Sequence, residues 1–153
     1  MTEPTTTQRL FERYNTLTRR PTVLDPRTRA VVFKAFQRTL GPWLPADRRA
    51  CILDIGCGEG ALLAFLRDQG YTNLHGFDLS PENVAICHRL GLTFVQQFDA
   101  LRLSEFPGPD HYDVIFAIDL VEHLPKQAAA RFLEQVWEHL APGGYTVIQT
   151  PNM

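Results

Sequence analysis

The feature that most constrains this chain is a short apolar run that breaks into three alternating glycines. The run Ile52–Ile55 has the length and composition of a buried strand, and a Gly-x-Gly-x-Gly turn follows at 56–60. The apolar residues 61–66 then indicate a helix. A strand, a glycine turn and a helix N-terminus in this order form a cradle for a nucleotide-containing ligand, because glycines let the backbone approach the ligand closely.

A carboxylate just before this turn narrows the choice of ligand. Asp54 lies two residues before the first glycine, where its charge would repel a pyrophosphate group on the turn. The same charge would attract a ligand with a cationic amino-acid tail. S-adenosylmethionine (SAM) has such a tail, and we therefore expect SAM rather than a dinucleotide.

Length and composition indicate a single globular domain. The chain has 153 residues, of which 44% are apolar and 21% are charged, as is ordinary for a soluble protein. No apolar run reaches the ~20 residues that span a bilayer, and the polar N-terminus lacks the apolar core of a secretory signal. The odd number of cysteines, 3, indicates reduced thiols. We therefore expect no membrane span and a cytoplasmic location.

The small net charge of −2 hides an asymmetry along the chain. Residues 1–50 carry a net charge of +6, and residues 51–153 carry −8. The basic stretch can meet an anionic partner, or dock on the chain's own acidic body. Its aromatic residues do not follow a pattern typical of nucleic-acid binding, so we expect no nucleic-acid partner. We assign 1–49 to an N-terminal helical basic arm or lid and 50–153 to a cofactor-binding core.

Hydrophobic periodicity predicts an alternation of strands and helices. Strands are expected over 51–55, 74–79, 93–98, 113–118 and 145–150. Helices are expected over 8–18, 26–40, 60–69, 80–90 and 125–140, with Asp25 and Ser80 as N-caps. This alternation predicts an α/β fold of three layers, in which helices cover both faces of a doubly wound, mostly parallel sheet of about five strands.

Five segments, in order, resemble the motifs of class I SAM-dependent methyltransferases, a family with a seven-strand Rossmann-like fold. They are Leu53–Gly60, Gly76–Ser80, Phe98–Ala100, Tyr112–Ile118 and Leu140–Gly144. The segments Tyr14–Pro21 and Ile148–Asn152 are also similar to bacterial methyltransferases linked to surface-glycan or quinone modification. The resemblance implies that the chain binds SAM, transfers its methyl group and releases S-adenosylhomocysteine (SAH).

The resemblance also implies roles for individual residues. Asp78 would accept hydrogen bonds from the two ribose hydroxyls, Asp99 would accept from the adenine amine, and the Ala100 N–H would meet a ring nitrogen. Leu79 and Phe98 would enclose the adenine ring. The expected cofactor-binding residues are Asp54, Gly56, Cys57, Gly58, Gly60, Asp78, Leu79, Phe98, Asp99, Ala100 and Ile118.

Methyl transfer to a hydroxyl group also calls for a proton acceptor. His123 is the first candidate for this base, and Asp119 and Glu122 are second choices. Alternatively, the Glu122-His123 pair orders the loop or supports the cofactor pocket. Asp119-x-x-Glu122-His123 also resembles the Glu-x-x-Glu-His metal motif of some quinone and small-RNA O-methyltransferases. We expect no metal, and keep a divalent ion at these three residues as a second hypothesis.

The family fold normally continues beyond the fifth strand with two further strands. The chain ends at Met153, so the strand over 145–150 would be an open apolar edge. We expect this edge to be covered by a C-terminal segment of a longer chain, by a second chain in a dimer, or by the N-terminal arm.

Three alternatives to this interpretation remain open. A nicotinamide-dependent reductase would fit Gly56-x-Gly58-x-x-Ala61, but Asp54 and Asp99 argue against it. A SAM-binding scaffold without turnover is the second. A nucleic-acid methyltransferase would need an Asn/Asp-Pro-Pro-Tyr/Phe motif, and the chain has 118–121 instead. We expect methyl transfer to a hydroxyl oxygen of a small-molecule, glycan or lipid-linked acceptor.

Overall fold

The computed structural model describes residues 22–151, and the expected helix over 8–18 lies outside this range. Five strands form one parallel sheet in the order β3-β2-β1-β4-β5. The strands are β1 (Ile52–Ile55), β2 (Leu74–Asp78), β3 (Gln96–Gln97), β4 (Tyr112–Ile118) and β5 (Leu140–Gln149). The doubly wound parallel sheet that the sequence predicts is therefore confirmed.

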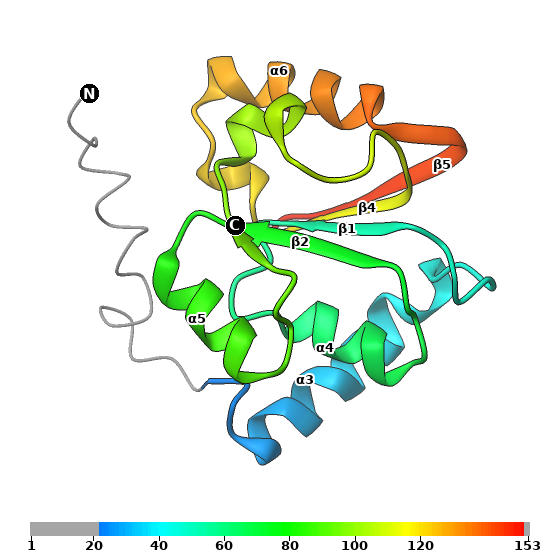
Figure 1. The fold of residues 1–153 in the computed structure, drawn as a ribbon, viewed down its shortest axis with the longest axis vertical. Helices are drawn as coiled ribbons and strands as arrows, with labels where there is room; N and C mark the ends of the chain where they lie inside the picture. Colours follow the sequence, from blue (N-terminus) through cyan, green and yellow to red (C-terminus); the bar gives the residue numbers. More distant parts are fainter. Residues whose placement is uncertain (1–21, 152–153) are drawn as a thin grey trace.

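Helices cover both faces of this sheet (Figure 1). One face carries α3 (Pro26–Thr39), α4 (Ala61–Asp68) and α5 (Pro81–Arg89). The other carries α6 (Lys126–Glu138) and the 3₁₀ helix η2 (Ala100–Glu105). Two short 3₁₀ turns, η1 (Gly41–Trp43) and η3 (Val121–His123), complete the structure. No helix within residues 22–151 is long and apolar enough to cross a membrane.

Successive residues of the central strands alternate between two hydrophobic cores, as the pleat of a strand requires. Ile52 of β1 packs with Phe65 of α4 in the first core. Leu53, the next residue of β1, packs with Phe132 of α6 in the second. The near-continuous apolar runs of β1 and β4 follow from this burial on both faces.

Helix α3 belongs to the first of these cores. The Asp25 carboxylate caps it by accepting from the Thr28 N–H at 3.0 Å, as expected from the sequence. Phe33 and Phe36 contact Phe65 of α4, with ring centroids 5.5 and 5.8 Å apart. The described part of the expected N-terminal arm therefore shares the core of residues 50–151.

The third strand is shorter than the predicted 93–98. β3 consists of Gln96–Gln97 alone. Before it, the chain makes a turn in which the Val95 N–H donates to the Leu92 carbonyl at 3.2 Å, and both side chains are buried. Because these residues turn the chain to bury their side chains, only two residues remain to pair with β2.

The fifth strand begins at Leu140 rather than at the predicted residue 145. Leu140 already pairs with Tyr112 of β4, and pairing resumes at Tyr145. The segment 141–144 is therefore a bulge within the strand, where the sequence predicted a connection between the helix over 125–140 and the strand over 145–150. A Cβ on Gly144 would lie 2.9 Å from the Tyr112 carbonyl oxygen, so this close approach requires glycine.

Strand β5 forms one edge of the sheet. Among residues 22–151 it pairs with β4 alone. What covers its outer side therefore stays a prediction.

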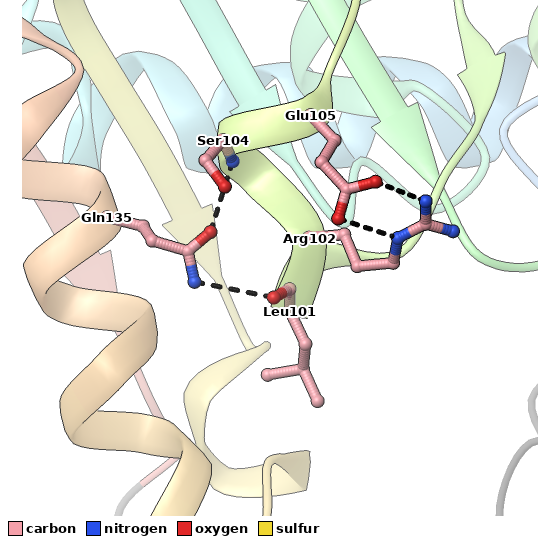
Figure 2. Close-up of polar contacts among 5 residues, drawn as sticks. All are labelled: Leu101, Arg102, Ser104, Glu105 and Gln135. Carbon is pink, nitrogen blue, oxygen red and sulfur yellow. Dashed lines mark hydrogen bonds and ion pairs between the residues drawn. The ribbon is translucent and has the colours of Figure 1, made fainter.

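A buried glutamine of α6 holds η2 in place. Gln135 is 9% exposed, and its Nε2 donates to the Leu101 carbonyl at 3.3 Å while its Oε1 accepts from the Ser104 N–H at 3.1 Å (Figure 2). These two bonds bracket Arg102, where the backbone leaves helical geometry. Arg102 and Glu105 form an ion pair on the exposed side. Gln135 thus supplies hydrogen-bond partners for the backbone groups on either side of this break in the helix.

Replacement of Gln135 by leucine should destabilise the fold. Gln135→Leu removes both partners at once, and each of these part-buried backbone groups left unpaired costs roughly 1 kcal/mol, the lower end of the range for buried groups. Urea denaturation should therefore show a loss of about 2 kcal/mol or more in unfolding free energy.

The matched control is Arg102→Gln, which breaks the exposed Arg102–Glu105 pair and should lower the unfolding free energy much less than Gln135→Leu does. Equal losses in the two variants would contradict a supporting role for Gln135.

Candidate functional site

A cavity of about 550 Å³ opens at the carboxyl ends of the strands. Its lining residues are Gly56, Gly58, Phe77, Asp78, Leu79, Asn83, Phe98, Asp99, Ala100, Ile118, Asp119, Leu120, Glu122, His123, Leu124 and Pro151. The chain leaves β1 in one direction for β2 and β3 and in the other for β4 and β5. Ligands of doubly wound sheets bind where the strand order reverses in this way.

Most of the residues that the sequence singled out meet at this cavity. All three expected catalytic residues line it, and so do all expected cofactor-binding residues except Asp54, Cys57 and Gly60. Those three are buried. They belong to the end of β1 and to the glycine turn but do not line the cavity.

Asp78, at the end of β2, organises the loops around it. Its Oδ2 accepts from the Gly58 N–H at 2.8 Å, which fixes the glycine turn. Its Oδ1 accepts from the Ser80 N–H and from Asn83 Nδ2, both at 2.9 Å. One carboxylate therefore ties the turn after β1 to the start of α5.

Asn83 is a site residue that sequence reasoning missed. It is buried, lines the cavity and positions the carboxylate of Asp78. The available signal was its place three residues after the N-cap Ser80, whose Oγ accepts from the Asn83 N–H. Only the folded chain shows that its amide turns toward Asp78 rather than toward the cap.

The wall of the cavity opposite the glycine turn combines an apolar surface with the carboxylate of Asp99. Leu79 and Phe98 are half-buried, and the Phe98 ring lies 5.5 Å from that of Phe77. Asp99 caps η2 by accepting from the Leu101 N–H at 2.9 Å. The aromatic packing fixes the Phe98 ring, and the cap fixes one oxygen of Asp99.

The third glycine of the turn is required by its backbone and by its neighbours. Gly60 has a φ of +78°, in the left-handed region, and it is the N-cap of α4. A Cβ at this position would lie 2.7 Å from Leu92 and 2.8 Å from the Cys87 sulfur. The turn therefore packs directly on the end of α5.

Asp54 is buried beneath this turn, with 2% of its surface exposed. Burial, followed by the charge of Asp78, raises the pKa of the Asp54 carboxyl to about 8. Without a ligand, this group is therefore largely protonated at neutral pH. A cation bound nearby would favour its ionised form.

Cys57 lies next to Cys87 in the interior. A hydrogen bond with the Cys87 thiol, then burial and the charge of Asp54, raises the pKa of the Cys57 thiol well above its ordinary value. A protonated, buried thiol is a poor nucleophile. These properties favour a packing role over a chemical one.

The catalytic candidates lie on the loop after β4. Asp119 has a φ of 52°, and its N–H donates to the Gln149 carbonyl at 2.8 Å. His123 Nε2 lies 3.9 Å from Glu122 Oε1, and both residues border the cavity. No group of three His, Cys, Asp or Glu among the described residues is arranged to hold a metal ion, which gives the metal hypothesis no support.

The buried carboxyl of Asp54 should make stability depend on pH. Its pKa is raised above the 3.8 of an exposed carboxyl, so the folded state keeps a proton that the unfolded state has lost. This contribution is complete below about pH 4 and is lost as the pH rises through about 8.

Between about pH 5.5 and 7.5, unfolding free energy should fall about 2–3 kcal/mol more in the wild type than in Asp54→Asn, at ~1.4 kcal/mol per pH unit. Urea denaturation at several pH values measures the difference. Parallel curves for the two proteins would contradict the raised pKa.

Comparisons with known proteins agree with this geometry. The sequence matches a family described as "Methyltransferase domain" over residues 25–153. It is 33% identical over 105 residues to the ubiquinone biosynthesis O-methyltransferase of Aeromonas salmonicida. That alignment covers 66% of this chain and 43% of the relative, so the chain spans less than half the length of that protein.

Solved methyltransferases share the fold at low sequence identity. A SAM-dependent methyltransferase from Archaeoglobus fulgidus has a TM-score of 0.70 at 24% identity, over 91% of this chain and 57% of the other. Magnesium protoporphyrin IX methyltransferase from Synechocystis PCC 6803, solved with bound SAM, has a TM-score of 0.63 at 16% identity. The match covers 92% of this chain and 74% of the other. With the family match extending over most of the sequence, this chain belongs to the methyltransferase domain family.

Proposed function

We propose that the cavity binds SAM and that the domain transfers its methyl group to a hydroxyl oxygen of a small-molecule, glycan or lipid-linked acceptor. The observation that carries the proposal is the carboxylate of Asp78, which holds the glycine turn and borders the cavity. The ubiquinone biosynthesis relative is named an O-methyltransferase, which supports the choice of oxygen.

Asp78 has room for one ribose hydroxyl. A carboxylate has about four lone-pair sites, and three protein donors already use this one. Within residues 22–151, Oδ2 has a single partner, the Gly58 N–H, so it is the oxygen that can accept another bond. We therefore assign one ribose hydroxyl to Asp78, where the sequence suggested two.

The adenine ring fits the wall formed by Leu79 and Phe98. The Asp99 Oδ1 is used by the Leu101 N–H, which leaves Oδ2 for the exocyclic amine. Ala100 is the first residue of η2, so its N–H has no acceptor within that helix and can meet a ring nitrogen. Gln135 acts here indirectly, because it holds η2 against α6.

The methionine part of the ligand would lie along Gly56, Gly58 and Ile118, which line the near side of the cavity. Asp54 does not line this surface, and its carboxyl would act on a cationic tail through charge once the bound cation favours its ionised form. Asp119 borders the same side and adds a second negative charge. This distribution favours a cation over a pyrophosphate.

SAM supplies a methyl group on a positively charged sulfur, which is already activated for displacement. The protein's task is therefore chiefly to orient the acceptor and exclude water. His123 borders the cavity, from where it would take the proton of an acceptor hydroxyl. The family match argues against the nicotinamide-dependent reductase considered above.

Binding of SAH should be micromolar and should depend on Asp78 and Asp99. Asp99→Asn keeps a good N-cap but places an amide where the adenine amine needs an acceptor. Asp78→Asn replaces an oxygen acceptor by a donor in the same way. Isothermal titration calorimetry should show SAH binding at least about tenfold weaker in each variant.

Thermal denaturation of Asp99→Asn provides the control, because a retained cap should leave its midpoint near that of the wild type. NADH should give no binding heat. Binding of NADH in place of SAH, or equal SAH affinity in both variants and wild type, would contradict the cofactor assignment.

Replacement of His123 distinguishes the two roles considered for it, catalytic base and support of the cofactor pocket. If His123 acts as the base, His123→Gln should bind SAH within about twofold of the wild type, since less than about 0.5 kcal/mol of binding energy is lost. Loss of affinity by about tenfold or more in the same titration would instead assign His123 to support of the cofactor pocket.

A further inference from the structure

Glu59, inside the glycine turn, holds the segment that precedes α3. Its Oε2 accepts from the Thr22 Oγ1 at 2.7 Å and from the Val23 N–H at 2.9 Å. Thr22 Oγ1 in turn accepts from the Leu24 N–H at 3.3 Å. Glu59 is half-buried and is not part of the cavity lining. Its carboxylate therefore serves a contact more than 30 residues away in sequence rather than the ligand surface.

The turn is thus held by carboxylates on two sides. Toward the cavity, the Gly58 N–H donates to Asp78. Away from it, the side chain of the next residue, Glu59, binds the Thr22–Val23 backbone and hydroxyl. The Val23 side chain is 6% exposed, so this contact also packs the segment against the protein interior. Hydrogen bonds to an ionised carboxylate are stronger than those between neutral groups.

We propose that Glu59 is a positioning residue that couples docking of the Thr22–Asp25 segment to the conformation of the cofactor turn. The proposal rests on the function proposed above. A ligand bound against Gly56 and Gly58 fixes the turn and therefore fixes Glu59, which then holds the segment more tightly. By linkage, an anchored segment strengthens ligand binding by the same factor.

A simpler role for Glu59 is available from its position before α4. A negative charge near a helix N-terminus stabilises the helix through its dipole. The variant Glu59→Gln distinguishes the hydrogen-bonding role from the helix-dipole role, because it keeps an acceptor oxygen but removes the charge. Thr22→Val tests the contact from the other side, because it removes the hydroxyl donor and leaves the glycine turn unchanged.

The experiment combines SAH titration with hydrogen exchange of the Val23 amide, followed by NMR. In the wild type, saturating SAH should slow exchange of this amide by about fivefold or more, the lower range of typical coupling between sites. Glu59→Ala should weaken SAH binding by a similar factor and abolish the SAH-dependent slowing. Thr22→Val should show a smaller loss in both. Glu59→Gln, whose neutral amide oxygen makes weaker hydrogen bonds than a carboxylate, should lie between the wild type and Glu59→Ala in both.

Glu134→Ala, which removes an exposed acid of α6, is the matched control and should behave as the wild type. The inference is wrong if the wild type binds SAH without slowing Val23 exchange. It is also wrong if Glu59→Ala lowers stability but leaves SAH affinity within about twofold. Absence of SAH binding by folded wild type would instead remove the proposed function, and the inference with it.

Discussion

The hydrogen bond from the Gly58 N–H to the carboxylate of Asp78 joins the ends of β1 and β2 at the centre of the sheet. Three alternating glycines would otherwise leave the turn with many accessible conformations. Asp78 restricts them from the cavity side, and Glu59 restricts them through Thr22 and Val23. The turn that forms this wall of the cavity is therefore held at two points, although it is built on the residues with the greatest backbone freedom.

The opposite wall is held in a similar way by buried polar groups. The Gln135 side chain holds η2 through two hydrogen bonds to its backbone, and Asp99 caps the same helix. Asn83 keeps Asp78 oriented from α5. A satisfied hydrogen bond adds only about 1 kcal/mol to the stability of the fold. The main effect of each of these side chains is therefore to fix the orientation of the neighbouring group that it binds.

The features that the sequence predicts correctly are those that depend on residues close together in the chain. The alternation of strands and helices, the caps at Asp25 and Ser80, and the order of strand-end acids all follow from spacing of a few residues. The length of β3 and the bulge in β5 do not, because competing burial and pairing with β4 decide them. Gln135 and Glu59 form hydrogen bonds with residues more than 30 positions away in the sequence, and no local sequence pattern predicts such contacts.

A crystal structure of the domain with SAH would show whether this cavity is the cofactor site. We predict the adenine ring between Leu79 and Phe98, its amine at Asp99, and one ribose hydroxyl on the Oδ2 of Asp78. SAH bound elsewhere, or with its ribose away from Asp78, would contradict the assignment of this cavity as the cofactor site.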